Sequence, residues 1–148
     1  VSAGYWQDPT ATAQNMVEGW FRTGDYGHLD NNGYLTIVDR IKDLIIVSGF
    51  NVPAVEVESC IAELASVQEV AVVARHDPHQ GESICAHIVT QDGLAISKKF
   101  IIDHCSRKLA PYKVPHHYIF CQTLPKNNLG KVLKRELRAM HDTGEKHD

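Results

Sequence analysis

Three polar clusters along the chain contain residue types that could do chemistry. In the first, at residues 19–25, Thr23 and Gly24 precede the carboxylate of Asp25. A carboxylate can accept hydrogen bonds from two adjacent hydroxyl groups, such as those of a ribose. A Thr-Gly-Asp sequence is also a common turn, and by itself it favours that plainer interpretation.

The second cluster covers residues 39–52 and contains Arg40 and Gly49. A guanidinium can bind a phosphate or a ribose through its fork of N–H donors, and a glycine lets a ligand approach the backbone closely. The simpler interpretation is a solvated linker for the charges and a tight turn for the glycine. Because the cluster lies between two structured stretches, it is also a candidate hinge.

The third cluster is a glycine loop followed by a basic helix, with Lys131 at the junction. An ammonium in this position could stabilise charge that develops on a transferring phosphate or carboxylate. The loop is not a P-loop, because no glycine lies five residues before Gly130 and Val132 stands where a Ser or Thr would hold magnesium. The plainer alternative is a basic surface helix.

The remaining histidines and cysteines give little sign of further chemistry. His76, His79 and Glu82 lie in a predicted turn and form no H-E-x-x-H pattern, so we expect no metal site. No Ser, His and Asp arrangement indicates a hydrolase triad. The four cysteines include no C-x-x-C pair, which is typical of reduced, buried thiols in a cytosolic protein.

Charge and hydropathy exclude several partners. The chain has 15 Lys and Arg against 18 Asp and Glu, a net charge of -3, so it has no general positive field for nucleic acid or an acidic membrane. No stretch reaches the roughly 18 apolar residues of a membrane span. We expect a cytoplasmic protein with at most peripheral contact with the inner membrane.

Alternating strand and helix patterns predict an α+β or α/β domain after an N-terminal hairpin. Residues 1–18 show no period and are expected to be irregular, with a turn at 8–10. Ser97 is expected to cap a helix. The other expected elements are a hairpin formed by 27–29 and 34–38, a strand at 44–47, a helix after Pro53, strands at 70–74 and 84–89 around a turn at 76–81, a loop at 91–93, a strand at 118–121 and a last helix with Leu133, Leu137 and Met140 on one face.

Taken together, the clusters occur in an order that resembles the adenylate-forming superfamily over residues 4–138. Supporting motifs are Gly4-Tyr5-Trp6, Gly81-Glu82 and residues 112–115. Residues 38–40, 46–52 and 124–131 are most similar to bacterial long-chain fatty acid CoA ligases. The resemblance implies an α+β fold in which residues 1–40 end a large AMP-binding domain and residues 41–148 form a small, mobile C-terminal domain.

The resemblance also implies a reaction and roles for individual residues. A fatty acid and ATP would give acyl-AMP and pyrophosphate, after which CoA would displace AMP, with Mg²⁺ and ATP held mainly by a part not present here. Lys131 would be catalytic in adenylation. Asp25 and Arg40 would bind the nucleotide, Lys42 would be the hinge, and Ser48, Gly49 and Phe50 would line the CoA path.

Some alternatives stay open at this stage. Pro53, two residues after Asn51, stands one position earlier than is usual in the family, which leaves the start of the next helix undetermined. The parent enzyme could be an aryl-CoA ligase or a carrier-protein-loading adenylation domain instead of a fatty acid ligase. The isolated chain is expected to be inactive. A further alternative, from another class of function, is a non-catalytic binding or interaction module.

Overall fold

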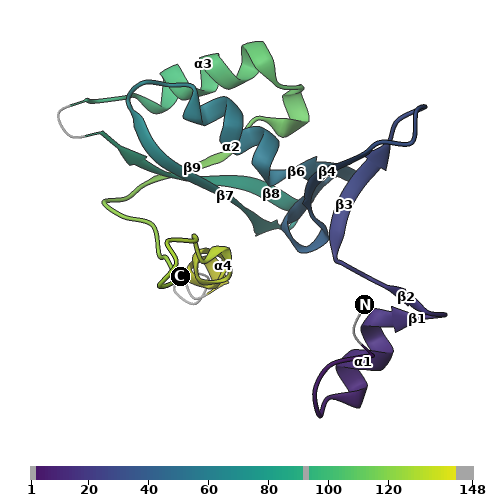
Figure 1. The fold of residues 1–148 in the computed structure, drawn as a ribbon. Coiled ribbons are helices and arrows are strands. Elements are labelled where there is room, and N and C mark those ends of the chain that lie inside the picture. The colour runs from purple at the N-terminus through teal and green to yellow at the C-terminus, as the bar shows by residue number, and fades with distance from the viewer. Residues whose placement is uncertain (1–2, 92–93, 143–148) are drawn as a thin grey trace. The chain divides into compact units, whose positions relative to one another are not determined.

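The computed structural model describes residues 3–91 and 94–142. Residues 1–2 of the first expected domain, residues 143–148 of the second, and Asp92 and Gly93 of the expected loop lie outside the described part. The chain divides into two compact units, Val1–Lys42 and Asp43–Asp148. The first unit contains α1 (Pro9–Asn15), β1 (Met16–Val17), β2 (Trp20–Phe21), β3 (Asp25–Leu29) and β4 (Leu35–Arg40) (Figure 1).

The expectation of irregular structure at the start of the chain is wrong for α1. Asp8 caps this helix, since its Oδ1 accepts the Ala11 N–H at 2.8 Å, and Pro9 occupies the first helical position. The supposed turn at 8–10 is therefore a helix start. Sequence periodicity missed the helix because none of its residues is buried.

The predicted hairpin in the first unit is confirmed. Strands β3 and β4 pair antiparallel, and Asp30 Oδ1 accepts the N–H groups of Asn32 and Tyr34, each at 2.9 Å. No described residue of Val1–Lys42 is buried. Trp6 and Trp20 are 88% and 80% exposed, so this unit has large apolar groups but no core of its own.

The second unit is built on a five-stranded sheet, in which β6, β5, β8 and β7 follow one another and β9 pairs with β8. All pairs are antiparallel except β8 and β9, which are parallel. The sheet is thus mixed, and the α+β class is confirmed. Its strands are β5 (Leu44–Val47), β6 (Phe50–Pro53), β7 (Val67–Asp77), β8 (Gly81–Thr90) and β9 (His117–Phe120).

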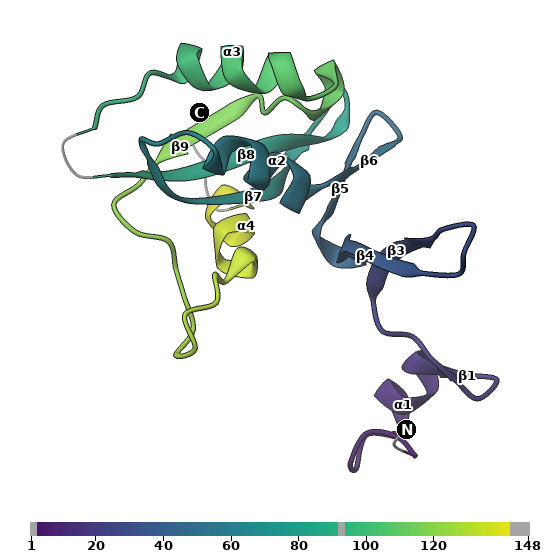
Figure 2. The same ribbon diagram turned by 45° about the horizontal axis from the view of Figure 1, so that its top comes forward.

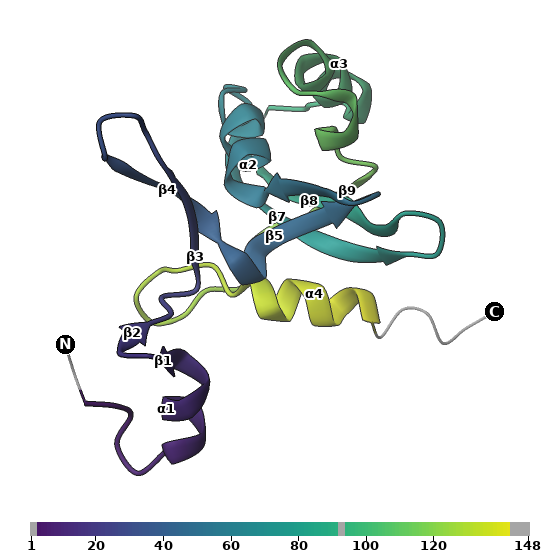
Figure 3. The ribbon, with the colours of Figure 1, turned by 90° about the vertical axis from the view of Figure 1, so that its right-hand side faces the viewer.

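Helices cover both faces of this sheet. Helices α2 (Ala54–Ala62) and α3 (Lys98–Lys108) lie on one face, and α4 (Lys134–Asp142) lies on the other (Figure 3). The core divides accordingly: Val57 and Ile61 of α2 pack with Ile84 and Ile88 of β8, while Leu137 of α4 belongs to a second apolar cluster. Side chains that alternate along β8 therefore enter different cores.

Most of the predicted elements of the second unit are present. Ser97 caps α3 through a hydrogen bond from the Phe100 N–H at 3.2 Å, as predicted. The helix after Pro53 begins at Ala54, with Pro53 as its N-cap residue. Strand β6 was missed, and two 3-10 turns, η1 (Ile41–Asp43) and η2 (Pro111–Lys113), complete the structure. No helix of the described residues is long and apolar enough to cross a membrane.

Candidate functional site

The two expected nucleotide-binding residues lie opposite each other in the first unit. Asp25 begins β3 and Arg40 ends β4, and the two are paired across the hairpin. The Arg40 Nε lies 2.8 Å from the Asp25 Oδ1, and the Arg40 Nη1 also donates to the Thr23 carbonyl at 3.4 Å. A carboxylate has two oxygens, so this ion pair does not use up its capacity to accept ribose hydroxyls.

This ion pair lies in the wall of a cavity of about 820 Å³. Lys42, the expected hinge residue, lines the same cavity together with Gln14, Asn15, Arg22, Thr23, Gly24 and Ile41. Gly24 has a φ of 76°, a conformation that strains other residues, and its carbonyl accepts the Ile41 N–H at 2.8 Å. The cavity is therefore open to solvent and bordered by both charges of the ion pair.

Ser48 and Gly49 form the tight turn between β5 and β6 in the second unit. Their φ angles are 49° and 85°, the positive values that a two-residue type I′ hairpin needs at both positions. An added Cβ at Gly49 would meet no atom within 4 Å. Within this unit the glycine is thus required by backbone conformation and not by crowding.

Glu82 fixes this turn from the neighbouring strand. Its Oε2 accepts the Ile46 N–H at 2.7 Å, and the Ser48 N–H donates to the Gln80 carbonyl at 3.1 Å. The Gly81-Glu82 motif is recognisable in the sequence, but the role of Glu82 is not. Its carboxylate supports the strand that leads into the Ser48-Gly49 turn.

Phe50, the third residue expected on the CoA path, stacks on Tyr112. The ring centroids are 4.6 Å apart with an interplanar angle of 22°, and Phe50 remains 54% exposed. Lys113, the residue after Tyr112, donates to both carboxylate oxygens of Glu56 in α2 at 2.7 Å. Tyr112 and Lys113 of the 112–115 motif thus have structural roles, which the sequence did not predict.

Lys131 lies in a tight loop that Asn127 closes. The Asn127 Oδ1 accepts the N–H groups of Lys131 at 2.9 Å and Leu129 at 3.0 Å, while the Asn127 N–H donates to the Lys131 carbonyl at 2.9 Å. Lys131 itself is exposed. The long connection between β9 and α4, which carries this loop, projects from the sheet (Figure 2). Lys131 is therefore held by its backbone and presented to solvent.

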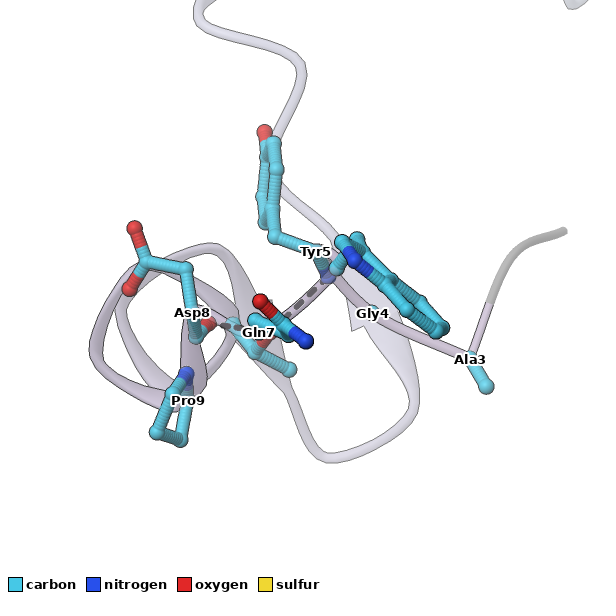
Figure 4. A pocket seen from close by; sticks show the side chains of 8 residues that line it. Ala3, Gly4, Tyr5, Gln7, Asp8 and Pro9 are labelled. Carbon is cyan, nitrogen blue, oxygen red and sulfur yellow. Dashed lines mark hydrogen bonds between the residues drawn. The ribbon is translucent and has the colours of Figure 1, made fainter.

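The Gly4-Tyr5-Trp6 motif lies beside a separate cavity of about 570 Å³ in front of α1 (Figure 4). The Tyr5 N–H donates to the Thr12 Oγ1 at 2.9 Å, and that hydroxyl donates to the Asp8 carbonyl at 2.8 Å. A Cβ on Gly4 would come within 2.7 Å of the Thr12 methyl group. The motif thus has a local packing role, and no expected site residue borders this cavity.

The structure brings the expected residues together in three places: Asp25, Arg40 and Lys42 around one cavity, Ser48 to Phe50 in one turn, and Lys131 in its own loop. Their roles remain predictions. Asn127 was missed, although an asparagine four residues before the lysine is a recognisable signal for a side chain that caps its own loop. Tyr112 and Glu82 could be assigned only once the strands and turns were placed.

Residues 56–131, just over half of the chain, match the AMP-binding enzyme C-terminal domain family. The chain belongs to this family. It is 45% identical over 137 residues to the long-chain-fatty-acid–CoA ligase FadD13 of Mycobacterium tuberculosis, covering 93% of this chain and 27% of the relative. It is also 45% identical over 138 residues to the Salmonella typhimurium long-chain-fatty-acid–CoA ligase, covering 93% and 24%.

A solved structure supports the same assignment. ATP-bound MatB from Rhodopseudomonas palustris superposes with a TM-score of 0.86 at 37% identity, covering 93% of this chain and 28% of that one. The chain spans about a quarter of the length of the curated relatives that it matches. The resemblance to adenylate-forming enzymes that the motifs predicted is thus confirmed.

Proposed function

We propose that this chain is the C-terminal part of an ATP-dependent long-chain fatty acid CoA ligase. The observation that carries the proposal is its 45% identity to long-chain-fatty-acid–CoA ligases over 93% of its length. The reaction joins a fatty acid to ATP, giving acyl-AMP and pyrophosphate, and the CoA thiol then displaces AMP. Residues outside this chain would supply the acid pocket and hold Mg²⁺ and the ATP phosphates, so the chain alone is inactive.

In this proposal Asp25 and Arg40 bind the nucleotide. The Asp25 carboxylate accepts hydrogen bonds from the ribose hydroxyls, and the guanidinium of Arg40 holds that carboxylate in place through their ion pair. Their position across one pair of strands supports this role, because the hairpin fixes both side chains at the same cavity. A nucleotide would therefore meet a site that needs little rearrangement.

Lys131 supplies positive charge during adenylation. Its ammonium would bridge the substrate carboxylate and the α-phosphate as negative charge builds up between them. The hydrogen bonds from Asn127 support this role, since they fix the backbone and leave the long side chain exposed. A lysine held in this way can reach into a neighbouring site and be withdrawn from it.

The second half-reaction requires the second unit to rotate about Lys42. The division of the chain into two units after Lys42 supports a hinge there. Rotation would withdraw Lys131 and bring the turn formed by Ser48, Gly49 and Phe50 to the acyl-AMP. A glycine at its tip leaves room for the pantetheine arm of CoA, whose thiol attacks the acyl carbonyl and releases AMP.

A chimera tests the proposal directly. The segment of the M. tuberculosis ligase that aligns with this chain is replaced by the chain, and acyl-CoA formation from a long-chain fatty acid is measured together with pyrophosphate release. We expect both products. The same chimera with Lys131→Ala is the control for residual activity of the upstream part, and the chain alone should release no pyrophosphate.

The rival functions give different results in the complete protein that carries this chain. Preference for aromatic acids would indicate an aryl-CoA ligase, and transfer to a carrier protein in place of CoA would indicate a loading domain. Saturable nucleotide binding by the chain itself, with neither acyl-AMP nor thioester formed by the complete protein, would favour a binding module. A cytoplasmic location, with at most peripheral contact with the inner membrane, stays a prediction.

A further inference from the structure

Helix α4 lies on the face of the sheet opposite α2 and α3 (Figure 3). Between α4 and β8, three side chains that could hold a metal ion come together: Cys85, His87 and His141. Cys85 and His87 lie two residues apart on β8 and so point to the same face. His141 lies near the end of α4, 54 residues from His87. None of these residues takes part in the proposed reaction.

The ligand atoms have a spacing close to that of a tetrahedral metal site. The Nε2 atoms of His87 and His141 are 2.9 Å apart, the Cys85 Sγ is 3.9 Å from the His87 Nε2, and all three atoms lie within 4.8 Å of one another. Around a zinc ion the N···N edge of a tetrahedron is about 3.4 Å and the S···N edge about 3.6 Å. Shifts of about 0.5 Å for the His87–His141 pair and about 0.3 Å for the Cys85–His87 pair would reach these edges, and the Cys85–His141 pair, within 4.8 Å, would have to close further.

The surroundings also favour a metal ligand set. Cys85 is fully buried and His87 is 3% exposed, whereas His141, near the end of α4, is partly exposed. Burial lowers the pKa of His87 to about 4, with a smaller contribution from His141, so this imidazole is neutral and needs to lose no proton to bind. In the absence of a metal, the Nε2 atoms of His87 and His141 can share one hydrogen bond. The Cys85 thiol then has only a weak contact with His87, at 3.9 Å.

The thiol is the part of the site that must change on binding. Burial raises the pKa of Cys85 to about 11, and the positive charge of Arg75 opposes this rise by favouring the thiolate. An incoming cation favours the thiolate far more strongly, so the thiol proton leaves for solvent and a metal–sulfur bond forms. Arg75 also repels the cation, and the new thiolate charge offsets that repulsion.

We propose that Cys85, His87 and His141 form a Zn²⁺ site that fastens α4 to β8, with a water molecule as the fourth ligand. One thiolate and two imidazoles suit a borderline-soft ion that prefers tetrahedral geometry. This departs from the sequence-based expectation of no metal site, which considered His76, His79 and Glu82. Glu82 instead binds the Ile46 N–H, and His76 and His79 lie at the exposed end of the β7–β8 hairpin.

The test uses the 148-residue chain, stripped of metal with a chelator and titrated with Co²⁺ as a spectroscopic stand-in for Zn²⁺. We expect saturation at one ion per chain, with a near-ultraviolet thiolate charge-transfer band and the visible bands of tetrahedral cobalt. Zn²⁺ should then displace Co²⁺ and raise the melting temperature. These measurements do not depend on the proposed enzyme activity, so either idea can fail without the other.

Three variants locate the site. Cys85→Ser should abolish the charge-transfer band, and His141→Ala should weaken Co²⁺ binding by more than about 100-fold, since loss of outer-shell partners alone costs 10 to 100-fold. His141 is partly exposed, so its variant should fold even if Cys85→Ser does not. The double variant His76→Ala, His79→Ala is the matched control and should bind normally. Binding of unchanged affinity in His141→Ala, binding lost in the control, or no charge-transfer band in the unsubstituted chain would each overturn the proposal.

Discussion

Asn127 and Lys131 hold each other through both side chain and backbone: the Asn127 Oδ1 accepts the Lys131 N–H, and the Asn127 N–H donates to the Lys131 carbonyl, each at 2.9 Å. Next to them, Lys126 and Val132 form an isolated antiparallel bridge. The loop is therefore closed at its base and capped from inside. The loop sets the position of Lys131, and the side chain carries its charge. The two properties can therefore be changed separately by substitution.

Removing that charge should affect only one half-reaction. In the active chimera, Lys131→Ala should raise the activation free energy of adenylation by on the order of 3 kcal/mol, because a preorganised charge at the transition state is lost. Conversion of supplied acyl-AMP and CoA to thioester should be retained. Lys126→Ala is the control, since Lys126 lies in the same loop but pairs with Glu69 at 2.7 Å. An equal loss in both half-reactions would show that Lys131 does not have this role.

Loosening the loop should have a milder effect of the same kind. Asn127→Ala removes the acceptor for two backbone N–H groups, and the displaced lysine should slow adenylation by about 10-fold to 100-fold. The kcat of adenylation should fall more than the affinity for ATP. Asn127→Asp keeps an acceptor oxygen and should restore most of the rate; failure of this rescue would argue against a positioning role.

Gly49 tests the CoA path. Gly49→Leu should leave pyrophosphate exchange near normal and strongly reduce thioester formation, because the added side chain would obstruct the pantetheine arm after rotation. A φ of 85° makes any substitution here strained. Gly49→Ala shares most of that strain without the bulk and is the control. Equal damage by Ala and Leu in both steps, with a lower melting temperature, would indicate strain alone.

The stack of Phe50 on Tyr112 should be measurable as a coupling energy. In a double-mutant cycle with Phe50→Ala and Tyr112→Ala, we expect the stability changes to be non-additive by about 1 kcal/mol, the usual range for such aromatic pairs. Chemical denaturation of the chain itself gives this value. Simple additivity would mean that the two rings stabilise the turn independently.

Glu63 should make the thermal stability of the chain depend on pH in the acidic range. A hydrogen bond from Lys108 is the main cause that holds the Glu63 pKa below its ordinary value, and His104 contributes further. A carboxyl group with a lowered pKa binds fewer protons folded than unfolded, so its stabilising effect is present above the unfolded pKa and is lost as the pH falls below it. The melting-temperature difference between the unsubstituted chain and Glu63→Gln should therefore shrink from pH 7 to pH 3. It should be small, because Glu63 is half exposed, and smaller still in high salt.

Much of the second unit could be predicted from its sequence, because its helices and central strands carry clear apolar periods. Strand β6 could not, since Asn51 and Pro53 interrupt the pattern. Pro53 is tolerated because β6 is at the edge of the sheet, where one side of the strand needs no partner. The polar ends of β7 and β8 were likewise assigned to a turn, although they pair as far as Asp77 and Gly81.

Within the candidate site, the predicted hairpin covered residues 27–29 and 34–38. In the structure its strands extend to Asp25 and Arg40, which places these two residues opposite each other. The Phe50–Tyr112 stack and the group formed by Cys85, His87 and His141 were not foreseeable. Each joins elements far apart in the sequence, and a periodic pattern specifies which face is apolar but not which element covers it.

The absence of a buried residue among those described in Val1–Lys42 has a calorimetric consequence. The heat-capacity change of unfolding reflects the apolar surface that becomes newly exposed, and this unit has little left to expose. A melting curve of the chain should thus report almost entirely on Asp43–Asp148, with a heat-capacity step below that expected for 148 residues. Amide protons of the β3–β4 hairpin should exchange with solvent long before those of β7 and β8.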